Sequence, residues 1–94
     1  MSEEFRDPVL EAWALTLRKV DDLMQLGLLE HLKCARVAGF SEDVLVLKIG
    51  NKISFDYLAK PSVKSHLLIL AKSIFEDCGL RLKDIQIESS IAEF

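Results

Sequence analysis

Residues 40–58, "FSEDVLVLKIGNKISFDYL", change periodicity halfway along, and this change decides the fold. The first part alternates apolar and polar residues as a strand does, whereas the apolar residues of the second part have the spacing of a helix. Gly50 and Asn51 stand between the two parts. The pattern predicts a strand that leads directly into a short helix.

A second strand is predicted just ahead of this stretch. Residues 34–40, "CARVAGF", have the same period of two, and residues 41–43, "SED", separate them from the strand "VLVLKIG" at 44–50. Two alternating segments joined by a few polar residues are typical of an antiparallel hairpin. We therefore expect a hairpin over residues 34–50.

A helix is predicted ahead of the hairpin, beginning at Asp7 and Pro8. Asp accepts hydrogen bonds from the free amides of a first helical turn, and proline suits the position whose N–H is not needed. Gly27 is expected to interrupt this helix, with a further short helix in "LLEHLK" at 28–33. The residues expected to face the core recur at spacings of three and four: Leu10, Trp13, Leu17, Val20 and Met24.

Two helices and a strand are predicted after the hairpin. A short helix carries Phe55 and Tyr57, and a long helix runs from Pro61 to about Cys78 and stops at Gly79. The segment "LKDIQIES" at 82–89 is expected to add a third strand. The predicted class is α+β: a small three-stranded sheet covered by helices, in the order α-α-β-β-α-α-β. We expect a flexible lead at 1–7, one interaction domain at 8–89 and a tail at 90–94.

Composition limits the classes of function. The chain has 94 residues, half of them hydrophobic, which suits one compact domain with its own core. Its formal charge of −3 does not favour nonspecific attraction to nucleic-acid phosphates. There is no apolar run of membrane-spanning length and no signal peptide, and the two cysteines lie far apart. We expect a cytoplasmic protein with reduced thiols and no contact with membranes.

The sequence offers no catalytic or cofactor-binding motif. Neither GxxxxGK[ST] nor GxGxxG occurs, and no serine or cysteine lies in a nucleophile motif. His31 and Cys34 have a spacing that would let both reach one metal, but His66 and Cys78 are twelve residues apart on the long helix and would not converge on it. We expect no enzyme, no zinc site and no cofactor.

The order of elements is similar to the K-homology architecture, which binds single-stranded nucleic acid with a GXXG loop. No GXXG occurs here. Lysines gather around the hairpin exit and define a candidate basic edge: Lys48, Lys52, Lys60 and Lys64. A nucleic-acid-binding module therefore stays open as an alternative, but it is not favoured.

The pentapeptide "QLGLL" at 25–29 resembles the QLxLF-type peptide by which bacterial replication proteins dock on the sliding clamp. Such peptides act as extended, accessible segments. This one lies at a predicted helix, and its leucines suit a core. We expect these residues to be buried.

A family resemblance extends over about residues 8–89. Trp13, then "LLEHLKCARVAGFSEDVLVLKI", "FDYL" and "IFEDCGLRLKDIQIES" resemble the accessory domain that follows the ATPase part of the bacterial DNA polymerase III gamma/tau subunit. The likeness lies in the element order and the apolar pattern, including an aromatic residue near the end of the long helix, here Phe75. It implies a clamp-loader module that holds the polymerase III catalytic subunit or the replicative helicase, with the ATPase on another part of a longer chain.

The amino-terminal domain of the bacterial replication initiator DnaA resembles the same architecture and is the competing family. It usually carries an F-x-x-W-hydrophobic stretch after its first helix, and the corresponding "LLEHLKCARV" has no Trp. This difference favours the gamma/tau resemblance.

A domain of this kind acts through its surface, so exposed aromatic and arginine residues are the first candidates for partner contacts. The candidate partner surface consists of Leu15, Arg18, Phe55, Tyr57, Ile91 and Phe94. Leu15 is included because it lies on the polar stripe of the first helix. Self-association through an open sheet edge is a third, weaker possibility.

Overall fold

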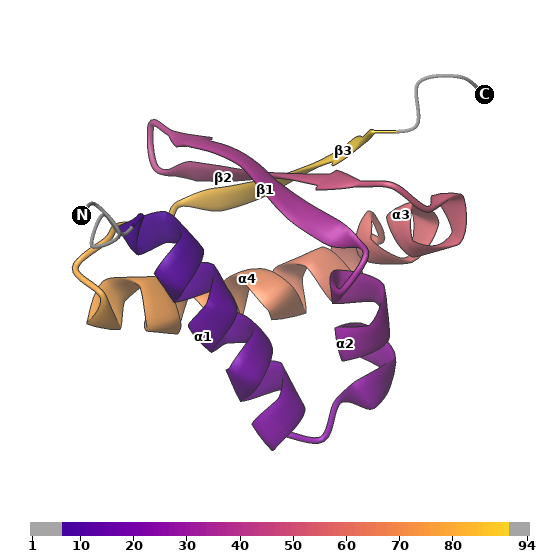
Figure 1. Cartoon of the computed structure of the whole chain (residues 1–94), viewed down its shortest axis with the longest axis horizontal. Helices are drawn as coiled ribbons and strands as arrows, with labels where there is room; N and C mark the ends of the chain where they lie inside the picture. The colour runs from indigo at the N-terminus through magenta and orange to yellow at the C-terminus, as the bar shows by residue number, and fades with distance from the viewer. Residues whose placement is uncertain (1–6, 91–94) are drawn as a thin grey trace, which may run out of the picture.

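The predicted fold class and element order are confirmed by a computed structural model, which describes residues 7–90. Helices lie mainly on one side of a three-stranded sheet, and α3 lies at one end of it (Figure 1). The elements in chain order are α1 (Pro8–Asp22), α2 (Leu26–Leu32), β1 (Ala35–Ser41), β2 (Val44–Ile49), α3 (Lys52–Leu58), α4 (Pro61–Asp77) and β3 (Asp84–Ser89).

The sheet has the order β1-β2-β3, with β2 in the centre. β1 pairs antiparallel to β2, and β3 pairs parallel to it, so the chain passes through α3 and α4 between the two parallel strands. Leu45, Leu47 and Ile49 alternate along β2 and are fully buried beneath the helices. Lys48 is exposed on the opposite, open face.

Local chemistry explains where most elements begin. Asp7 caps α1 by accepting from the amide of Val9 at 2.9 Å, and Asn51 caps α3 by accepting from the amide of Ser54 at 3.0 Å. The hairpin turn needs positive φ at both central residues, Glu42 (53°) and Asp43 (65°), because this geometry follows the twist of the flanking strands.

The end of α4 has the form predicted from the sequence. Gly79 takes a left-handed φ of +82°, its amide donates to Glu76, and the amide of Leu80 donates to Phe75. These two hydrogen bonds define the Schellman motif, in which glycine is the usual residue. Phe75, one turn earlier, is fully buried in the core.

The predicted end of the first helix is wrong. α1 ends at Asp22, and Met24, with a φ of 59°, makes the break that Gly27 was expected to make. Gly27 lies inside α2 instead. The hydrogen bonds from Met24 to Asp21 and from Gln25 to Val20 form a second Schellman motif, closed without a glycine.

The predicted core face of α1 is also partly wrong. Trp13 and Val20 are buried as expected, but Leu10 and Met24 are exposed. Ala12 and Thr16 are fully buried instead, on the helix that packs against α4. The core is made of these buried hydrophobic residues: Ala12, Trp13, Val20, Leu28, Leu32, Leu45, Leu47, Ile49, Leu58, Leu67, Ala71, Phe75, Leu82 and Ile85.

Candidate docking surfaces

The two partner-surface candidates on α1 are both exposed. Leu15 and Arg18 face away from the core. Arg18 also lines a shallow groove of about 460 Å³ between α1 and α2, whose apolar side includes Leu17 and Leu29. Leu15 and Arg18 are therefore available for contact with a partner.

The other candidates do not join that surface. Phe55 is half-buried and packs against the core from α3. Tyr57, also on α3, stacks on His31 with ring centroids 4.3 Å apart. α1 and α3 lie at different ends of the molecule (Figure 1), so the set forms no single patch. Ile91 and Phe94 lie outside the described residues, as do positions 1–6 of the expected lead.

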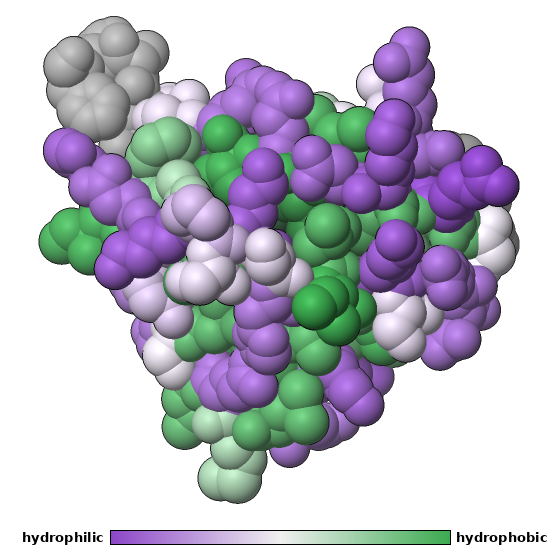
Figure 2. All heavy atoms as spheres, turned by 180° about the vertical axis from the view of Figure 1, so that it is seen from behind, coloured by the Kyte–Doolittle hydropathy of each residue, from purple (hydrophilic) through white to green (hydrophobic). Residues whose placement is uncertain are grey.

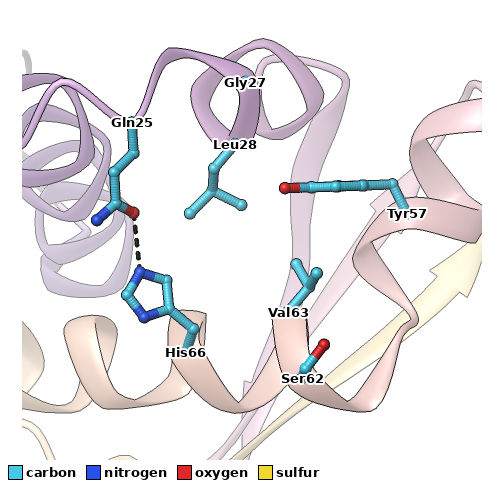
Figure 3. Close-up of a pocket in the computed structure, with 7 residues that line it drawn as sticks. All are labelled: Gln25, Gly27, Leu28, Tyr57, Ser62, Val63 and His66. Carbon is cyan, nitrogen blue, oxygen red and sulfur yellow. Dashed lines mark hydrogen bonds between the residues drawn. The ribbon is translucent and has the colours of Figure 1, made fainter.

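A hollow of about 420 Å³ opens between α2, α3 and the start of α4. Leu28 faces it from α2, the hydroxyl of Tyr57 points into it, and Val63 lines it from α4 (Figure 3). At one side Nε2 of His66 lies 2.8 Å from Oε1 of Gln25, to which it donates. An apolar lining with a few polar groups suits a side chain of a peptide or protein.

A second histidine contact fixes α2 against α3. Nδ1 of His31 lies 2.8 Å from the hydroxyl of Ser54, which is 4% exposed. The backbone amide of Ser54 also donates to the side chain of Asn51. Ser54 therefore takes part both in the N-cap of α3 and in the contact with α2. His31 thus has a structural role between two short helices, and no carboxylate accompanies it in this contact.

The four lysines of the candidate basic edge are spread over three elements. Lys48 lies on the open face of the sheet, between Arg36 of β1 and Glu88 of β3 in the strand register. Lys52 pairs with Asp56 at 3.1 Å, and the ammonium of Lys60 lies 5.8 Å from the ring centre of Tyr57. Lys64 is half-buried on α4. One of the four charges is therefore already offset by a carboxylate.

The cysteines and histidines considered for zinc stay apart. Cys34 is exposed and Cys78 is half-buried, while His31 and His66 bond to different neighbours. Within residues 7–90, no cluster of three or more histidines, cysteines and carboxylates could hold a metal ion. Nor does any helix of this part have the length and apolar character needed to cross a membrane.

The clamp-type pentapeptide is helical. Gln25 is the N-cap of α2, and residues 26–29 form its first turn. Leu28 is 5% exposed, because it packs in the core. The prediction that this segment serves the core is confirmed for Leu28, whereas Leu26 is exposed.

An exposed apolar group at the turn between α1 and α2 was missed by the sequence reading. Leu23, Met24 and Leu26 are 44%, 76% and 54% exposed. Figure 2 shows apolar surface at the lower end of the molecule, where Figure 1 places this turn. The signal in the sequence was three large apolar residues within four positions, but helical periodicity assigned Met24 to the core, and Leu26 was expected to be buried with the other leucines of residues 25–29.

Comparisons with known proteins give no relative: no family model, no curated protein and no solved structure matches the chain.

Proposed function

We propose that this chain is a protein-docking domain of the bacterial clamp loader, corresponding to the accessory domain of the DNA polymerase III gamma/tau subunit. The observation that carries the proposal is the exposed apolar turn formed by Leu23, Met24 and Leu26, which lies outside the cluster of buried core residues. Adjacent exposed apolar side chains on a small domain indicate an interaction site. A cytoplasmic location follows from this role.

The element order and the family resemblance support the clamp-loader assignment. The chemistry of the surfaces supports docking rather than catalysis. The hollow between α2, α3 and α4 places a histidine against a neutral amide, and its lining contains no carboxylate that would serve as a partner in proton transfer. Such a lining selects a partner by shape and by a few hydrogen bonds.

The test is an NMR titration of the isotope-labelled domain with the polymerase III catalytic subunit and, separately, with the replicative helicase from the same organism. We expect one of the two to shift or broaden amide signals on one face, including the α1–α2 turn. A well-folded sample that responds to neither protein at micromolar concentration would refute the proposal, and the initiator-type assignment would then be the next to test.

A nucleic-acid-binding module is the second candidate function. Arg36 and Lys48 are neighbours across β1 and β2 on the open face of the sheet, which favours it. The opposing observation is that Glu88 of β3 pairs with Lys48 in the strand register, which places a carboxylate beside the lysine. If this function holds, single-stranded DNA added at low salt should shift the NMR amide signals of β1 and β2, and added salt should reduce the shift. If it does not hold, these signals should not move.

A further inference from the structure

The backbone of the α1–α2 turn is unusual for a Schellman motif. The residue in the left-handed position is Met24, with a φ of 59°, and its amide donates to Asp21 at 2.9 Å. A side chain with a Cβ is disfavoured in this conformation, which is why glycine or asparagine is usual there. Methionine at this position therefore makes the turn less stable than glycine would.

The side chain of Met24 gains little packing in return. It is 76% exposed, and Leu23 and Leu26 on either side are about half exposed. An apolar side chain held in a disfavoured backbone conformation and left in water stabilises neither the turn nor the core. Strain of this kind is concentrated at binding and switching sites.

Two carboxylates make the same turn unfavourable for a third reason. Asp21 and Asp22 occupy the last turn of α1, where the helix dipole presents its negative end and Lys19 is the basic residue of the same turn. Both are exposed, and within residues 7–90 neither has an ion pair. The lysines that do form ion pairs bond elsewhere: Lys33 with Glu30 and Lys52 with Asp56.

We propose that the segment Asp21–Leu26 is the epitope by which this domain docks, and that its partner is a protein groove with an apolar floor and a basic rim. Met24 inserts into the floor, with Leu23 and Leu26 beside it. Asp21 and Asp22 meet lysine or arginine side chains on the rim, since charge complementarity steers association and excludes acidic partners. The inference rests on the proposed docking function and adds the surface and the chemistry of the partner.

Another exposed apolar residue provides the matched control. Ile53 is 73% exposed on α3, which lies away from the α1–α2 turn (Figure 1). It has an ordinary helical backbone and lies next to a lysine instead of two carboxylates. If exposed apolar area alone caused docking, Ile53 would matter as much as Met24.

The experiment measures the dissociation constant of each variant for the polymerase III catalytic subunit and for the replicative helicase, together with its melting temperature. Met24→Gly should weaken binding about tenfold or more, as truncation of a central apolar anchor does, while melting no lower than the wild type. Leu26→Ser should also weaken binding. The double variant Asp21→Asn, Asp22→Asn should bind several-fold more weakly and with less dependence on salt. Ile53→Ser should bind as the wild type does.

The possible failures are distinguishable. If the wild type binds one of the two proteins and the Met24, Leu26 and Asp21/Asp22 variants bind it equally well, this inference is overturned and the proposed function stands. If the Ile53 variant loses affinity as much as Met24→Gly, docking is not specific to the turn, and the inference is again overturned. If the wild type binds neither protein, the proposed function fails and this inference with it.

Discussion

Gly27→Ala and Gly79→Ala are the same chemical change, and the structure predicts opposite effects on stability. Neither glycine has a heavy atom within 4 Å of the place where a Cβ would be added, so no clash enters the comparison. Only the backbone conformation differs. Gly27 lies inside α2, whereas Gly79 holds a left-handed φ of +82° after α4.

The magnitudes follow from these conformations. In a helix interior, alanine is more stable than glycine by about 0.5–1 kcal/mol; because Gly27 is the second residue of α2, Gly27→Ala should stabilise the domain by about 0.5 kcal/mol, the lower end of that range. In the left-handed region a Cβ costs about 1–2 kcal/mol. Alanine also lowers the conformational entropy of the unfolded chain, which stabilises the folded variant by about 0.4–1 kcal/mol. The net effect of Gly79→Ala should therefore be a loss of stability of about 1 kcal/mol. At about 4–8 °C per kcal/mol for a domain of this size, the two variants should melt about 10 °C apart.

Thermal and urea unfolding followed by far-ultraviolet circular dichroism would measure both variants against the wild type. A stabilised Gly27→Ala shows that residue 27 is helical in solution. A destabilised Gly27→Ala would refute the reasoning, because it would mean that this glycine interrupts a helix, as the sequence alone had suggested. An unchanged Gly79→Ala would mean that α4 ends in another way.

Four further substitutions test the cap, the core and the sheet. Asp7→Ala removes the acceptor at the start of α1 and should cost about 1 kcal/mol in urea unfolding; an unchanged midpoint would count against the cap. Thr16→Val should be neutral or stabilise the domain by up to about 1 kcal/mol, because the buried hydroxyl donates to the carbonyl of Ala12, within its own helix, at 2.9 Å; a clear loss would point to another partner of the hydroxyl. Leu47→Ala should cost about 2–5 kcal/mol, because this side chain is fully buried in the central strand. Lys48→Ala on the open face should change stability by less than about 0.5 kcal/mol, and equal losses at 47 and 48 would contradict the assignment of faces.

Most of the fold could be predicted because its signals are local. The proline and aspartate at the start of α1, the alternation on both sides of the hairpin turn, and the glycine after α4 each act within a few residues. The structure confirms all three. The hairpin was the most secure prediction because two alternating segments flank a short polar turn, which leaves few other ways to bury their apolar residues.

The errors arose where tertiary contacts outweigh local propensity. Glycine at position 27 reads as a helix stop, but a short helix packed through Leu28 and Leu32 tolerates it. Met24 reads as a core residue because it continues the helical spacing, yet the helix has ended before it. Ala12 and Thr16 carry no strong apolar signal, yet both are fully buried in the folded domain. The exposed apolar turn was missed for the same reason, since Met24 and Leu26 were expected to be buried.

The parallel pairing of β3 with β2 sets an order of events during synthesis. β1 and β2 are joined by a two-residue turn and can pair as soon as both exist, whereas β3 follows only after α3 and α4. At the usual rate of translation, the roughly 40 residues from the end of β2 to the end of β3 take about 2–8 s to make. During that interval the edge of β2 that later pairs with β3 is open, and β2 carries three fully buried apolar residues of the folded domain. The hairpin before β3 has been made is thus the state of this protein that we expect to be most prone to aggregation.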